Sequence, residues 1–148
     1  MRALAGSSLA LLLLGACVPA PGGTERTVAG PAAEVLARVG AELGTLGFNR
    51  GSSGPGTLSA STQRVAAAWA TCPPVLVSDG DDRRVMASAE ARTARVTATA
   101  APAGAATALR VDAAFAATYR NRLRATSFER ACRSTGQLEA LLLGAAGG

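Results

Sequence analysis

The sequence predicts an α+β fold in which an antiparallel sheet of about four or five strands carries an N-terminal and a C-terminal helix on one face. Three patterns support this prediction: an alternation of period two over residues 109–119, an apolar stripe at helical spacing over 35–46, and a leucine-rich segment after residue 134. Two helices packed on one face of the sheet would bury both helical stripes.

The longest regular pattern is the alternation over residues 109–119, which predicts a strand with one buried and one wet face. Its two faces carry Leu109, Val111, Ala113, Phe115, Ala117 and Tyr119 on one side, and Arg110, Asp112, Ala114, Ala116 and Thr118 on the other. Val96, Ala98 and Ala100 alternate with polar residues in the same way. The stretch "PAGAAT" between the two runs predicts the turn of an antiparallel hairpin.

The N-terminal helix is predicted from Pro31, which suits a first helical turn, to Gly47, which ends it. Its apolar stripe consists of Val35, Leu36, Val39, Leu43 and Leu46. Glu34, Arg38 and Glu42 lie four residues apart on another face, which predicts a solvated row of ion pairs.

The segment after this helix carries weaker signals. Phe48 begins a candidate strand, and residues 57–62 could return as its hairpin partner. Residues 64–71 suit either a helical turn or a strand. Residues 75–77 are a short candidate strand that runs into a turn with three aspartates, which lacks the ligand spacing and closing glutamate of a calcium loop. The aspartates are Asp79, Asp81 and Asp82.

The chain is predicted to end in a helix. Ser134 and Gln137 have the spacing of a capping box, and Leu138, Leu141 and Leu142 form the expected apolar face.

The first residues follow the pattern of a secretory signal, with Arg2, a short apolar run and small residues before Cys17. Leu14-Gly15-Ala16-Cys17 resembles the lipobox of bacterial lipoproteins. This resemblance implies that residues 1–16 are removed, that Cys17 is lipidated, and that the acyl chains anchor the protein in a membrane. Ordinary cleavage after Ala20 is the alternative reading. Residues 17–30 are then expected to form a flexible tether, and residues 31–148 a single small domain.

The resemblance also predicts a location. Val18, rather than aspartate, follows the lipidated cysteine, which resembles sorting to the outer membrane in bacteria with two membranes. We therefore expect a lipid-anchored protein of the cell envelope, on the periplasmic face of the outer membrane.

Cysteine usage agrees with an exported protein. Of three cysteines, lipid would occupy Cys17, which leaves Cys72 and Cys132 as a pair. An oxidising compartment favours a disulfide between them, and the alternative is two separate buried thiols. A bridge closing a loop of about 60 residues is worth roughly 4 kcal/mol in the chain-entropy model.

All 15 basic residues of the chain are arginines, against ten acids. The most basic stretch contains Arg120, Arg122, Arg124, Arg130 and Arg133. If the strand continues to residue 124, the first three of these project from one face. This predicts contact with anionic lipid, glycan or an acidic partner. The alternative is a solvated, charged strand end. We do not expect nucleic acid as a partner of an exported lipoprotein.

The chain lacks the residues on which most kinds of catalysis depend. The chain has no histidine and no lysine, so histidine-based triads and lysine Schiff bases are excluded. No metal-ligand spacing or nucleotide-binding loop is present, and no cofactor or small-molecule substrate is inferred. We therefore expect a non-enzymatic accessory lipoprotein that contacts another envelope protein. The alternative is a binding module for anionic lipid or glycan.

Overall fold

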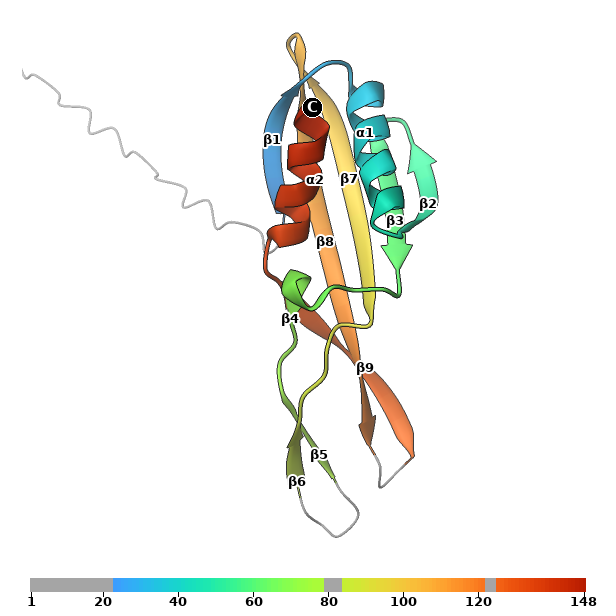
Figure 1. Cartoon of the computed structure of the whole chain (residues 1–148), viewed down its shortest axis with the longest axis vertical. Coiled ribbons are helices and arrows are strands. Elements are labelled where there is room, and N and C mark those ends of the chain that lie inside the picture. Colours follow the sequence, from blue (N-terminus) through green and yellow to red (C-terminus); the bar gives the residue numbers. More distant parts are fainter. Residues whose placement is uncertain (1–22, 79–83, 122–124) are drawn as a thin grey trace, which may run out of the picture.

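The structure, a computed structural model, describes residues 23–78, 84–121 and 125–148. The elements in chain order are β1 (Gly23–Ala29), α1 (Ala32–Thr45), β2 (Asn49–Gly54), β3 (Thr57–Thr62), the 3₁₀ helix η1 (Ala67–Trp69), β4 (Ala70–Thr71), β5 (Val75–Ser78), β6 (Arg84–Ala87), β7 (Thr93–Ala103), β8 (Ala106–Asn121), β9 (Thr126–Ser134) and α2 (Gln137–Gly147). Figure 1 shows an elongated molecule with both helices in its upper half.

Within the described ranges, seven strands form one sheet, in the order β2-β3-β7-β8-β9-β4, and β1 also pairs with β8. Strands β5 and β6 form a separate two-stranded ribbon, and every pairing is antiparallel. The predicted class of antiparallel sheet with two helices is confirmed, whereas the predicted four or five strands are too few. The strands that were missed expose most of their side chains, so no alternation marks them in the sequence.

Strand β8 is the spine of the molecule. Strand β7 pairs with one of its edges, while the other edge is shared: β1 pairs with residues 106–112 and β9 with residues 115–121. The predicted alternation is confirmed, because Leu109, Val111, Phe115, Ala117 and Tyr119 are all buried. This long strand therefore belongs to two parts of the molecule with different neighbours.

The upper part, which we call the body, contains the main core. Helices α1 and α2 contact each other and cover the same face of the sheet (Figure 1). Their fully buried side chains include Val35, Val39, Leu138 and Leu142. They pack on the inward residues of β3, β7 and β8, such as Leu58, Val96, Ala98, Leu109 and Val111.

The lower part, which we call the distal arm, consists of residues 115–121 of β8, strand β9, and the β5–β6 ribbon with its connections (Figure 1). Its buried side chains are few. Tyr119 stacks on Phe128 with ring centroids 5.6 Å apart, and its hydroxyl donates a hydrogen bond to the carbonyl of Pro73. Val77 on the ribbon is also buried. The arm is therefore held by a small satellite cluster.

The predicted tether is wrong for residues 23–29, which form β1. Thr107 in β8 donates a hydrogen bond to the carbonyl of Gly30 at 2.7 Å, and Val28 is buried in the core. Val28 is the one buried apolar side chain among residues 24–29, so the strand leaves no alternating pattern. Residues 17–22, including Cys17, lie outside the described residues.

The two helices confirm most of the predicted core but not their predicted polar contacts. In α1 the guanidinium of Arg38 donates to the carbonyl of Ala29 at 3.1 Å, and within the described chain no ion pair joins it to Glu34 or Glu42. Residues 64–71 contain both candidate elements, the short helix η1 and strand β4. The aspartate turn lies largely outside the described residues.

The predicted capping box of α2 is wrong, because Gly136 is the N-cap residue, with φ at 83°. The hydroxyl of Ser134 instead accepts from the backbone N–H of Gly136 at 3.0 Å and donates to Glu139 at 2.7 Å. Leu143, rather than the half-exposed Leu141, completes the buried face.

Candidate functional site

The three described members of the predicted arginine set, Arg120, Arg130 and Arg133, do not lie together. Arg122 and Arg124 lie outside the described residues, beyond the end of β8 at Asn121. Arg120 shares the helix-free face with its partner Ser127, but Arg130 lies on the other face, with its guanidinium 5.5 Å from the Phe128 ring centroid. Arg133 lies about 20 Å up the sheet from Arg120 on ideal strand spacing. The chain reverses after β8, and this reversal separates arginines that are close in sequence.

The predicted cysteine pair is joined by a disulfide. The Cα atoms of Cys72 and Cys132 lie 4.3 Å apart, directly after the pairing of Thr71 with Arg133. Cys132 is also the register partner of Phe115, where the arm begins on β8. The bridge therefore links the chain entering the β5–β6 ribbon to β9 at the base of the arm.

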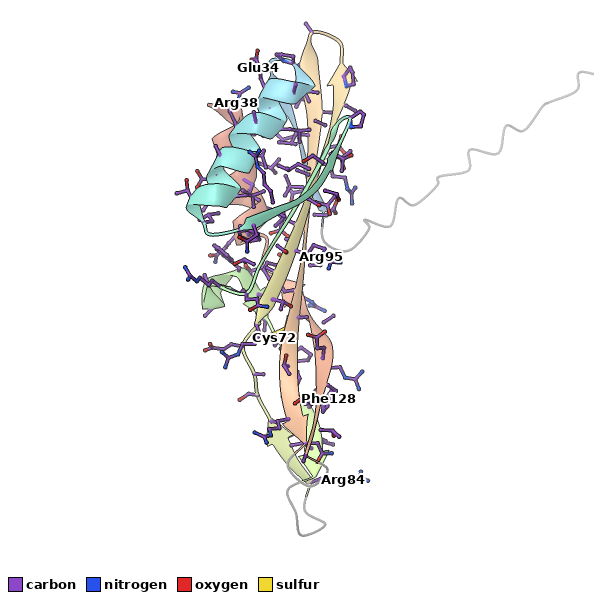
Figure 2. All side chains as sticks on the ribbon, turned by 90° about the vertical axis from the view of Figure 1, so that its right-hand side faces the viewer. Glu34, Arg38, Cys72, Arg84, Arg95 and Phe128 are labelled. Atoms are coloured by element: carbon purple, nitrogen blue, oxygen red, sulfur yellow. A yellow bond between two sulfur atoms is a disulfide. The ribbon has the colours of Figure 1, made fainter. Side chains whose placement is uncertain are left out.

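The arm exposes an apolar pair. Leu76 on β5 and Met86 on β6 are register partners, and each side chain is 60% exposed. Within the described residues only Leu141 joins them as a large exposed hydrophobic side chain. The alternation of side chains places Arg84, two residues from Met86, on the same face of the ribbon. We call these three residues the Leu76–Met86 face; Figure 2 shows Arg84 at the far end of the arm.

Sequence reasoning missed this face although a signal was present. The stretch from Val75 to Ala87 contains an Asp-Gly pair between two short apolar runs, which is a strong local signature of a β-hairpin. The second run, "RVMA", is too short for its alternation to predict a strand by itself. Without a second predicted strand, the sequence predicts no cross-strand partner for Leu76.

A second feature lies on the helix-free face of the sheet, and we call it the helix-free hollow. Its volume is about 700 Å³, and its lining comes from β2, β3, β7, β8 and β9. Ala114, Ala116 and Ala131 form the floor, because these short side chains interrupt a face of longer ones. Arg95 and Glu129 stand at its walls, and Figure 2 shows Arg95 on the side away from α1.

Charges on this face are arranged in two ways. Above the hollow, Arg110 donates two hydrogen bonds to Asp112, at 2.8 and 3.0 Å, and these bonds raise the pKa of the guanidinium above its ordinary value. The side chains of Arg95 and Glu129 have no hydrogen bond or ion pair in the described part of the chain. The hollow therefore holds Arg95 and Glu129 as two opposite charges that do not neutralise each other. The third charged lining residue, Arg130, directs its guanidinium toward the Phe128 ring.

Known proteins give no guide to the site. No protein-family model matches the chain, and no curated protein matches it in sequence. In the described ranges, no group of three or more His, Cys, Asp or Glu residues is placed to hold a metal ion. No described helix combines the length and the apolar character needed to cross a membrane.

Proposed function

We propose that this protein is a lipid-anchored, non-enzymatic accessory protein of the cell envelope that binds a partner protein through its distal arm. The observation that carries the proposal is the Leu76–Met86 face. Two large apolar side chains stand opposite each other, each 60% exposed, on a ribbon that projects beyond the core. Exposed apolar pairs at the centre of a polar surface are typical of the anchor residues of protein interfaces.

The bracing of the arm supports this role. A ribbon of two strands is marginal alone, but here the Cys72–Cys132 bridge and the hydrogen bond from Tyr119 to Pro73 fix it to β8 and β9. A surface that is ordered before binding loses less conformational entropy when a partner arrives. Arg84 on the same face favours a partner whose apolar pocket has an acidic rim.

The position of the anchor favours a protein over the membrane as the occupant of the arm. Gly23 pairs with Asp112, at the middle of the spine. The six residues from Cys17 span at most about 20 Å. Residues 112–121 of β8 extend about 30 Å further toward the tip. If the arm stood upright with its tip on the bilayer, Gly23 would lie farther from the bilayer than the tether can reach. The arm therefore points along or away from the membrane.

The lipid anchor is tested by Cys17→Ser. Because the acyl chains are attached to the Cys17 sulfur, the variant is expected to leave the membrane fraction or to accumulate as an uncleaved precursor. The measurement is fractionation with intact-mass spectrometry. Unchanged lipidation would contradict the anchor.

The arm is tested by photo-crosslinking in cells of the native host, with a photoreactive residue at position 76, 86 or 141. We expect positions 76 and 86 to give an adduct with the same protein, at a peptide containing acidic residues, and the control position 141 on α2 to give none. Arg84→Glu is expected to weaken both adducts. Lipid adducts alone would favour the binding module for anionic lipid, and no discrete adduct would overturn the proposal.

A further inference from the structure

The helix-free hollow is separate from the arm's apolar face and carries its own chemistry. Its volume of about 700 Å³ lies within the range of small-molecule and peptide sites. The register brings its lining together from distant parts of the chain: Arg95 pairs with Ala114, and Ala116 pairs with both Thr93 and Ala131. A ligand lying across the three alanines meets little steric obstruction from the sheet.

The two charged walls are too far apart to satisfy each other. Arg95 and Glu129 lie two strands apart, and their register partners on β8 are Ala114 and Thr118. Ideal sheet spacing therefore puts their Cα atoms about 16 Å apart. The contrast with Arg110 and Asp112, which neutralise each other on the same face, shows that the sheet geometry allows pairing where residues are adjacent.

Polar groups at the Arg95 end of the hollow can hydrogen-bond a backbone. Thr93 lies on β7 beside Ala116, between the two walls. Asn49, Ser61 and Gln63 lie beyond Arg95, on the side of β2 and β3. Amides and hydroxyls of this kind both donate and accept, as a peptide backbone requires. The floor offers methyl groups only, which suits small side chains.

From these observations we propose that the helix-free hollow binds a short peptide in its zwitterionic form, with its carboxylate at Arg95 and its amino group at Glu129. Guanidinium–carboxylate contacts are charge-assisted and can be bidentate. An extended tripeptide has termini about 10 Å apart, and a contact of about 3 Å at each end brings the span to about 16 Å. This is the separation of the two charged groups when both side chains stand perpendicular to the sheet. This inference does not depend on the function proposed for the arm.

The test is calorimetric titration of the full chain in detergent with tri-alanine, its C-terminal amide and its N-acetyl form. Tri-alanine is expected to bind saturably, and each capped form about tenfold more weakly, because each loses one charge-assisted contact. Arg95→Gln should abolish discrimination against the amide, and Glu129→Gln discrimination against the acetylated form. Arg120→Gln, on the same face but outside the hollow, is the matched control and should change nothing.

Two results would overturn the proposal: no saturable binding up to about 10 mM tri-alanine, which corresponds to a negligible affinity, or equal binding of all three peptides. Thermal unfolding of each variant verifies that these exposed substitutions leave the fold intact. Leu76→Ser should bind tri-alanine normally, so a failure of the hollow and a failure of the arm are distinguishable.

Discussion

The body and the distal arm share strand β8 but are stabilised in different ways. In the body, two helices bury the inward face of the sheet, and side chains such as Val35, Leu109 and Leu142 are fully enclosed. In the arm, the same strand continues with Ala117 and Tyr119 buried under a two-stranded ribbon rather than under helices. Burial therefore accounts for the body, whereas the arm depends on specific bonds.

This difference is informative about function. A two-stranded ribbon with so little core needs bracing to hold one position. The disulfide at the base and the hydrogen bond from Tyr119 to Pro73 supply that bracing, and they leave Leu76 and Met86 exposed. This arrangement fits the binding role proposed for the arm, and the comparison can be tested by weakening each part separately.

The largest effect is expected from removing the bridge with the double substitution Cys72→Ser and Cys132→Ser. The cysteines are 60 residues apart in sequence, so the chain-entropy model predicts a loss of about 4 kcal/mol in the free energy of unfolding. Denaturant titration measures the loss, and hydrogen exchange locates it. Amides of β5, β6 and β9 should exchange faster than those of α1. Equal acceleration in both parts would show that the arm and the body unfold as one unit. As a control, reductant should destabilise the wild type but not the double variant.

A core truncation in the body is expected to cost slightly less. Leu142→Ala removes a fully buried side chain on α2 and should lower the free energy of unfolding by about 3 kcal/mol. Leu141→Ala, on the neighbouring residue that is 39% exposed, is the matched control and should cost less than about 1 kcal/mol. Similar losses for both variants in denaturant titrations would contradict the assignment of the buried face.

The sequence predicted the body better than the arm, for a physical reason. Burial of one face produces a periodic pattern of apolar residues in the sequence. This pattern identified β8 from Leu109 to Tyr119 and α1 from Val35 to Leu43, and it identified α2 as well. Strands β1, β6 and β9 are mostly exposed, and their positions depend on pairing with β8 or β5 rather than on their own composition.

The candidate sites follow the same logic. The disulfide could be predicted because compartment and count leave only Cys72 and Cys132. The arginine cluster could not, because its geometry depends on where β8 ends and how β9 returns, which turns Arg130 to the opposite face from Arg120. The hollow does have a signal in the sequence. Ala114 and Ala116 lie on the face of β8 that was predicted to be exposed to solvent, where longer polar side chains are usual.

Two single hydrogen bonds allow a matched comparison of the parts. Tyr119→Phe removes the bond to Pro73 in the arm, and Thr107→Val removes the bond to Gly30 in the body. Each should lower the free energy of unfolding by about 1 kcal/mol, because the carbonyl loses its donor. Hydrogen exchange should then accelerate around β5 for the first variant and around β1 for the second. Exchange that rises in the same segments for both variants would remove the distinction between arm and body.

The smallest effect on stability is expected where the effect on function should be greatest. Leu76→Ser with Met86→Ser removes two side chains that are already 60% exposed, so the free energy of unfolding should change by about 0.5 kcal/mol or less. Val77→Ser, on the buried face of the same strand, should instead destabilise the arm measurably in the same titration. The photoreactive residue is placed at a ribbon position other than 76 and 86. If the double variant keeps its fold and no longer forms the protein adduct at that position, the exposed pair serves binding rather than folding. If the double variant loses as much free energy of unfolding as Val77→Ser, the pair is part of the arm's own packing. That result would contradict the proposal that the arm is an interface.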